Sequence, residues 1–183
     1  ASLPPHASPS EPPPQPIAPS ESATPIPASA PEVVAAVRKT LVFLEAKSAS
    51  GELIKSGSGF VADEAGLIVT NHHVVEGAAK VVITFSDGRQ AQVSEWVAAS
   101  VGTDLVALRV NGHSTQLAPI ALAEALPQPG ADVLAIGAPL GQRETVTKGI
   151  VSAIRKGSEL PGNDGIDANS IWIQTSTPIA PGS

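Results

Sequence analysis

Two adjacent histidines, His72 and His73, follow Asn71, which comes directly after a short stretch (67–70) that is typical of a strand. Strand ends are where a rigid scaffold meets solvent, and reactive side chains are commonly placed there. The other two histidines lack this setting, because His6 lies in a proline-rich segment and His113 in a predicted turn. The pair is therefore the first candidate for chemistry in this sequence.

Three interpretations of the pair differ in the partners that they require. A metal site would use His72, His73 and Glu76, but helical zinc motifs need two histidines one helical turn apart, and the chain has no cysteine to add. A pair of polar residues in a surface turn would need no partner. A general base would need a carboxylate to hold one ring nitrogen and a serine to give up its proton.

Candidates for both of these partners occur further along the chain. Asp104 opens the apolar stretch 105–108, although aspartate is unfavourable in strands. Taken alone, Asp104 is better explained as an exposed residue before an edge strand. Ser183 follows Pro181-Gly182 in what reads as a tight turn after a strand. With the histidine pair, these residues give the chain order histidine, aspartate, serine.

The sequence around these residues is typical of short antiparallel strands separated by turns rich in Gly, Asp and Asn. The expected strands are Leu41–Leu44, Gly59–Ala62, Leu67–Thr70, Val81–Phe85, Arg89–Val97, Leu105–Val110, Pro119–Leu122, Val133–Ile136, Thr145–Arg155 and Ile171–Thr175. Before them, Ser29 and Glu32 have capping-box spacing, which predicts a short helix over Val33–Lys39. Strands at this spacing favour an all-β barrel or sandwich.

Composition limits the partners of the chain. More than half of its 18 prolines lie in residues 1–31, and this segment is predicted to be a disordered or polyproline-like tether. The net charge of −6, with only 11 scattered Lys and Arg residues, argues against nucleic acid as the main partner. No apolar run approaches the roughly 18 residues that would span a bilayer.

Four stretches, in this order, resemble blocks of the trypsin-like serine proteases of the bacterial HtrA/Deg (DegP-like) family. They are SGSGFVADEAGLIVTNHHVVEGA (56–78), TDLVALRV (103–110), VLAIGAPLG with TVTKGIVSAIR (133–155), and IQT with IAPG (173–182). They resemble the histidine block, the aspartate block, the beginning of the second barrel and the approach to the nucleophile loop. Any one of them alone is a weak signal. Four in order, with suitable gaps, identify residues 33–183 as a member of the family.

The resemblance implies a role for each matching residue. His73 is the general base, His72 fills a slot usually held by Asn, and Asp104 orients His73. The nucleophile loop of the family usually reads Pro-Gly-Asn-Ser-Gly-Gly, which puts Ser183 on the asparagine slot and the nucleophile at position 184. Ser183 is itself the nucleophile only if the loop is one residue shorter. The backbone N–H of Gly182 would form half of the oxyanion hole.

The fold implied by the resemblance is all-β, a chymotrypsin/trypsin-like double antiparallel β-barrel. The protease domain is expected over residues 32–183, after the tether 1–31. Its first barrel would span about 40–111 and an incomplete second barrel about 117–183. Because further strands and the nucleophile would follow Ser183, we expect the fragment 1–183 alone to be poorly folded and inactive.

The implied function is that of a serine endopeptidase for unfolded or damaged proteins, which acts in protein quality control without a metal or cofactor. Its implied partners are polypeptide substrates and further copies in a homo-oligomer such as a trimer. The proline-rich tether would join the domain to something upstream, such as a membrane anchor or a cleaved leader. The implied location is extracytoplasmic, in the bacterial periplasm or cell envelope. The alternative is a catalytically inactive pseudoprotease that serves as a binding or scaffold module, because a fold does not guarantee activity. The identity of residue 184 separates the two.

Overall fold

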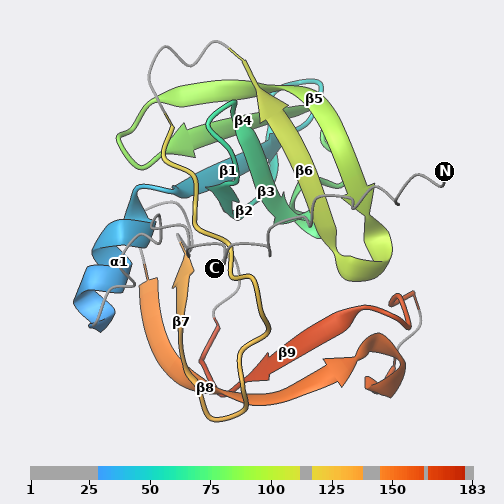
Figure 1. The fold of residues 1–183 in the computed structure, drawn as a ribbon. Coiled ribbons are helices and arrows are strands. Elements are labelled where there is room, and N and C mark those ends of the chain that lie inside the picture. The colour runs from blue at the N-terminus through green and yellow to red at the C-terminus, as the bar shows by residue number, and fades with distance from the viewer. Residues whose placement is uncertain (1–28, 112–116, 138–144, 163–164, 180–183) are drawn as a thin grey trace, which may run out of the picture.

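The structure, a computed structural model, describes residues 29–111, 117–137, 145–162 and 165–179. In Figure 1 a closed barrel of six strands lies above a sheet of three strands, with one helix beside them. The elements are α1 (Ala30–Arg38), β1 (Leu41–Lys47), β2 (Leu53–Val61), β3 (Leu67–Asn71), α2 (His72–Val75), β4 (Lys80–Phe85), β5 (Gln90–Ser100), the 3₁₀ turn η1 (Val101–Thr103), β6 (Leu105–Val110), β7 (Asp132–Gly137), β8 (Thr145–Lys156), the 3₁₀ turn η3 (Gly157–Glu159) and β9 (Ile171–Thr175).

The barrel closes in the strand order β1-β2-β3-β6-β5-β4, and all of its neighbouring strands are antiparallel. Strand β1 alternates between half-buried and buried residues, as expected where one face of a strand lines a core. The barrel core consists of Val42, Leu44, Val61, Ile68, Val74, Val75, Val81, Ile83, Phe85, Val106, Leu108, Val110 and Leu117. Nearly all of these are Val, Leu or Ile, which pack well on a pleated surface.

Two turns that the sequence predicts are confirmed. Gly66 between β2 and β3 and Gly88 between β4 and β5 have φ values of 87° and 84°, which glycine adopts without steric strain. At the first turn, Asp63 accepts hydrogen bonds from the Leu67 N–H at 2.8 Å and from Arg109 Nη1 at 3.0 and 3.1 Å. The Leu67 N–H and the Arg109 guanidinium together hold the pKa of Asp63 below its ordinary value. This carboxylate therefore fixes the hairpin to β6.

The second unit is an antiparallel sheet in the order β7-β8-β9. Its central strand β8 pairs along its first half with β7 and along its second half with β9. A closed barrel followed by a partial sheet confirms the predicted all-β, double-barrel class, with the second barrel incomplete over the residues that the structure describes.

One predicted strand is wrong, because residues 119–122 form no strand. The Ile120 N–H donates to the Val61 carbonyl at 2.9 Å, but Pro119 has no N–H with which to continue a ladder. The Leu122 side chain is 68% exposed, so this apolar residue does not face a core. The segment is an extended connection between the two β-units.

Helix α1 begins slightly earlier than predicted and starts with the expected capping residues. The Ser29 N–H donates to the Glu32 carboxylate at 3.0 Å, and the Ser29 hydroxyl donates to it at 2.8 Å. Ala30 and Pro31, which the sequence places in the tether, form the first turn of this helix. The rest of the predicted tether, 1–28, lies outside the described residues. Among the described residues, no helix has the length and apolarity needed to cross a bilayer.

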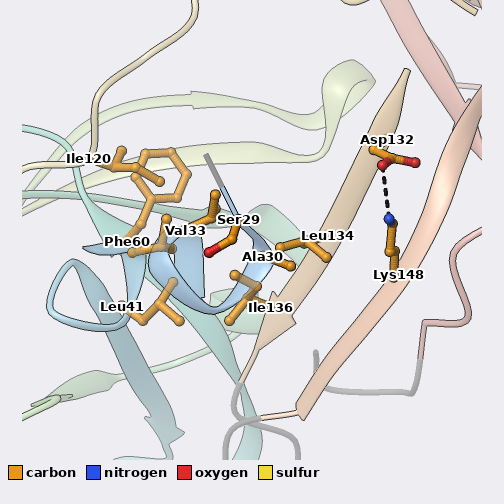
Figure 2. A pocket seen from close by; sticks show the side chains of 11 residues that line it. Ser29, Ala30, Val33, Leu41, Phe60, Ile120, Asp132, Leu134, Ile136 and Lys148 are labelled. Atoms are coloured by element: carbon orange, nitrogen blue, oxygen red, sulfur yellow. Dashed lines mark ion pairs between the residues drawn. The ribbon is translucent and has the colours of Figure 1, made fainter. Parts of the chain in front are cut away.

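Helix α1 also borders a groove that lies between the two β-units (Figure 2). The groove has a volume of about 580 Å³. Its apolar lining includes Val33 and Val37 from α1, Leu41 and Phe60 from the barrel, and Leu134 and Ile136 from β7. Asp132 and Lys148, which also line it, form an ion pair of 2.8 Å. The helix therefore contributes to the junction of barrel and sheet.

Leu44→Ala is expected to lower the free energy of unfolding by about 3 kcal/mol, because it empties a fully buried position of the barrel core. The matched control is Leu53→Ala on β2, where the side chain is 58% exposed and the expected change is within about 0.5 kcal/mol. Urea denaturation of both variants measures the difference. Equal losses at the two positions would contradict the assignment of Leu44 to the core.

Candidate active site

His73 lies in a single helical turn that directly follows strand β3. Asn71 ends the strand and caps α2, and the side chains of Val74 and Val75 are buried in the barrel core. These two valines fix the turn to the barrel, whereas the His73 side chain is 64% exposed. The sequence thus places an accessible imidazole on a rigid support.

Asp104 occupies the position between η1 and β6. Its backbone is left-handed, with φ 52° and ψ 42°, and it is the only non-glycine residue of positive φ among the described residues. Aspartate enters this region more readily than most residues, but still at a cost of about 1 kcal/mol. Because β6 pairs with β3, with Leu105 opposite Asn71, this turn brings Asp104 beside α2.

Asp104 contacts His73 through both carboxylate oxygens. Oδ1 accepts a hydrogen bond from the backbone N–H of His73 at 2.9 Å, and Oδ2 lies 2.6 Å from His73 Nδ1. The first bond fixes the carboxylate relative to the main chain, and the second fixes the imidazole. His73 Nε2, on the opposite side of the ring, is then available to exchange a proton. The two residues that the sequence singles out as base and carboxylate are brought together.

The backbone and side chain of residues before His73 add three further hydrogen bonds to Asp104. Asn71 Nδ2 donates to Asp104 Oδ2 and to the Asp104 carbonyl, at 3.1 Å each, and the His72 N–H donates to the same carbonyl at 3.0 Å. Sequence reasoning did not identify Asn71. An amide at a strand end is ordinary, and only the pairing of β3 with β6 reveals what it contacts.

Lys55 on β2 is a second contact that the sequence did not identify. Its Nζ donates to the His73 carbonyl at 2.9 Å and lies 3.5 Å from Glu76 Oε2. The Lys55 ammonium therefore supports the end of the helical turn that carries His73. Glu76, which the metal-site interpretation would use as a ligand, is therefore engaged in an ion pair with Lys55. Over the described ranges, no three His, Asp or Glu side chains are grouped closely enough to hold a metal ion.

The surroundings of Asp104 keep its carboxyl ionised. Partial burial would by itself raise the pKa of Asp104, but the hydrogen bonds from the His73 N–H, the His73 imidazole and Asn71 outweigh it. The net result is a pKa below the ordinary value of 3.8. At neutral pH the group is therefore an anion that can stabilise a protonated imidazole.

This lowered pKa predicts how acid affects stability. A carboxyl whose pKa falls on folding stabilises the native state above its unfolded pKa, and loses this contribution as pH falls through the folded pKa. Wild type should therefore lose stability relative to Asp104→Asn as pH is lowered from about 5 toward 2. Denaturant titrations at several pH values measure this difference, and a difference that does not change with pH would contradict the lowered pKa.

The segment that approaches the predicted nucleophile loop is fixed to β8. The Ile150 N–H donates to Ser176 Oγ at 3.0 Å, and the Ser176 N–H donates to the Ile150 carbonyl at 3.0 Å. Thr147 Oγ1 donates to the Pro178 carbonyl at 2.7 Å. Thr177 is buried and packs over Gly149. A Cβ added to Gly149 would lie only 2.5 Å from Thr177 Oγ1. These contacts hold the chain up to the edge of the described part.

The remaining predicted site residues are not placed by the structure. Gly182 and Ser183 lie outside the described residues, and so do His6 and His113. Within the described part, the site consists of His73 and Asp104, with Asn71 and Lys55 around them.

Comparisons with known proteins identify the family of the chain. Residues 57–183 match the family described as the trypsin-like peptidase domain. The chain is 38% identical over 138 residues to a probable periplasmic serine endoprotease, DegP-like, of Halomonas elongata, a match that covers 75% of this chain and 27% of that protein. It is also 38% identical over 169 residues to the serine protease PepD of Mycobacterium tuberculosis, covering 86% of this chain and 35% of PepD.

A solved structure shares the fold. The crystal structure of the serine endoprotease from Yersinia pestis is similar with a TM-score of 0.60 and 30% sequence identity, over 70% of this chain and 46% of that one. The chain thus spans about a quarter to a third of the length of the curated relatives named above.

Proposed function

This chain belongs to the trypsin-like peptidase family, and on that basis we propose that the full-length protein is a serine endopeptidase whose general base is His73 and whose orienting carboxylate is Asp104. The observation that carries the proposal is the 2.6 Å contact between His73 Nδ1 and Asp104 Oδ2 on a barrel that holds both residues. A binding module would not need an imidazole held in this manner.

The contacts of the pair define its part in the reaction. A serine Oγ adds to the carbonyl carbon of the peptide bond while its proton passes to His73 Nε2. The imidazolium that results is stabilised by the ionised Asp104 carboxylate at Nδ1. His73 then gives the proton to the departing amine, and the C–N bond breaks. Water then adds to the carbonyl carbon of the acyl-enzyme while its proton passes to His73 Nε2, and His73 returns that proton to the serine Oγ as the ester C–O bond breaks.

The nucleophile is assigned to position 184, and to Ser183 if the loop is one residue shorter. The backbone N–H of Gly182 and that of the nucleophile would donate to the oxyanion that forms on the carbonyl oxygen. Support for this part comes from the order of the motifs and from the contacts that fix residues 176–178 to β8.

The proposal extends to substrates and surroundings. Unfolded or damaged polypeptides are proposed as substrates, in a role in protein quality control, and the space outside the cytoplasm as the location. The support is that relatives from several bacteria are named periplasmic serine endoproteases. Assembly into a homo-oligomer such as a trimer is proposed with the family resemblance as its only support. Attachment through residues 1–31 to a membrane anchor, with a cleaved leader as the alternative, is proposed from the proline-rich composition of that segment.

A fluorophosphonate probe tests the proposal directly, because it reacts with a serine that a nearby base has activated. The full-length protein should be labelled at position 184, or at Ser183 if the loop is shortened, and mass spectrometry of tryptic peptides identifies which. His73→Ala should lose the label, since the base is then absent. A folded wild-type protein that takes up no label would support the pseudoprotease instead.

A further inference from the structure

The connection between β8 and β9 crosses from the second sheet to the barrel. Its residues 165–170, the Asp167 turn, lie against residues 100–104 of the barrel, the aspartate turn. The Asp167 N–H donates to the Gly102 carbonyl at 3.0 Å. In Figure 1 this end of the β8–β9 hairpin lies directly below the bend that joins β5 to β6. The second sheet therefore contacts the barrel two residues before Asp104.

The contact is close on both sides. A Cβ on Gly102 would lie 3.0 Å from the Asp167 backbone nitrogen, 3.3 Å from the Asp167 Cβ and 3.3 Å from the Gly165 carbonyl oxygen. Real Cβ atoms seldom approach neighbouring atoms so closely, because such contacts are repulsive. Glycine at position 102 therefore lets the two turns pack directly, backbone against backbone.

The Asp167 turn has internal supports that make it a firm partner. Asp167 Oδ1 accepts from the Asn169 N–H at 2.9 Å, and the Asp167 carbonyl accepts from the Ser170 N–H at 3.0 Å. Ser170 Oγ accepts from Trp172 Nε1 at 2.7 Å. Gly157 packs beneath the turn with no space for a side chain, because its Cβ would overlap the Asp167 carbonyl oxygen. The turn is thus fixed to η3 and β9.

Asp104 has a particular need of such a support. Its left-handed backbone is strained for a residue that is not glycine, and strained residues persist only where surrounding contacts hold them. The barrel supplies the bonds from Asn71 and the His72 N–H to the Asp104 carbonyl. The second sheet supports the same turn from the other side, through the hydrogen bond from the Asp167 N–H to the Gly102 carbonyl.

We propose that Asp167 is a positioning residue for the acid–base pair: its turn holds Gly102 from the second sheet and so keeps the Asp104 carboxylate on His73 Nδ1. The expected effect on kcat rests on the proposed function. The structural part of the inference concerns only the aspartate turn and is open to measurement without activity.

The test uses two variants of the full-length protein that act from opposite sides of the contact. Gly102→Val pushes the Asp167 turn away, and Asp167→Ala removes the acceptor that holds the Asn169 N–H and so loosens the turn. We expect kcat for peptide hydrolysis to fall about 10- to 100-fold in Gly102→Val and less in Asp167→Ala, with KM changed by no more than about twofold, because a shift of about 1 Å in catalytic geometry has effects of this size.

Two controls and a spectroscopic readout separate positioning from general damage. Asp167→Asn keeps an oxygen acceptor and should restore kcat to near the wild-type value. Glu124→Ala removes one exposed negative charge from the connection between the two β-units, outside the Asp167 turn and its supports, and should leave kcat unchanged within about twofold. The short contact with Asp104 is expected to place the proton of His73 Nδ1 at low field in the NMR spectrum, and this resonance should move or broaden in Gly102→Val and Asp167→Ala only.

The outcomes are distinct for the two claims. If both variants fold and keep the wild-type kcat and low-field resonance, the positioning inference is overturned. If Gly102→Val does not fold, Asp167→Ala, which changes an exposed residue, decides the matter. If wild type hydrolyses no peptide, the proposed function fails, and the resonance in the variants still decides whether the Asp167 turn positions Asp104.

Discussion

His73→Ala is expected to lower kcat/KM for peptide hydrolysis by the full-length protein about 10⁴-fold or more. In the proposed mechanism the His73 imidazole accepts the serine proton, and Asp104 Oδ2 lies 2.6 Å from its Nδ1. Alanine leaves the backbone bond from residue 73 to Asp104 Oδ1 in place, so the loss should come from chemistry and not from unfolding. Hydrolysis of a fluorescent casein, together with a thermal melt, measures both.

His72→Ala is the matched control, because it removes an imidazole from the adjacent residue of the same turn. The bond from residue 72 to the Asp104 carbonyl is made by the backbone N–H, which alanine retains. We therefore expect His72→Ala to keep activity within about tenfold of wild type. If the two alanine variants lost activity equally, the assignment of the base to His73 would be wrong.

Asp104→Asn is expected to lower kcat about 10⁴-fold, the effect known for this substitution in catalytic triads. Asparagine can still accept the bond from the His73 N–H, but an amide NH₂ facing Nδ1 favours the imidazole tautomer with its proton on Nε2. That tautomer cannot take a proton from serine. The variant should bind peptides with little change in KM, which a kinetic titration at pH 7 would establish.

Asp132→Asn serves as the charge-matched control for Asp104→Asn. Asp132 is an exposed carboxylate on β7 that pairs with Lys148 at 2.8 Å, away from His73. Its loss should leave kcat within about twofold of wild type. A comparable fall in both variants would point to a general effect of charge, and would remove the specific role that we assign to Asp104.

Local sequence chemistry was sufficient to predict the barrel hairpins. Gly66 and Gly88 stand between apolar stretches, and each position requires a positive φ that glycine supplies. The same reasoning failed at Pro119–Leu122, where the apolar residues suggested a strand. Whether such a segment pairs depends on a neighbouring strand and on donors that proline lacks, and neither is visible in a short window of sequence.

The candidate pair, His73 and Asp104, could be predicted because the sequence around both residues resembles blocks of a known family, whereas the residues that support the pair could not. Asn71 and Lys55 have ordinary side chains at ordinary places, and they gain a role only when β3, β6 and β2 come together. The contact of Gly102 with Asp167 joins residues that are far apart in the chain. No spacing rule relates such positions, so folding in three dimensions is needed to reveal them.

The closed barrel should also protect the contact between His73 and Asp104 against local opening of the fold. β1 pairs with both β2 and β4, so the first unit has no terminal strand that can peel away alone. Separation of β3 from β6, which carry His73 and Asp104 at their ends, therefore requires that the whole ladder opens. β9, by contrast, lies at the edge of its sheet and can detach in smaller, more frequent events. We therefore expect the contact between His73 and Asp104 to persist longer than the pairing of β9 with β8.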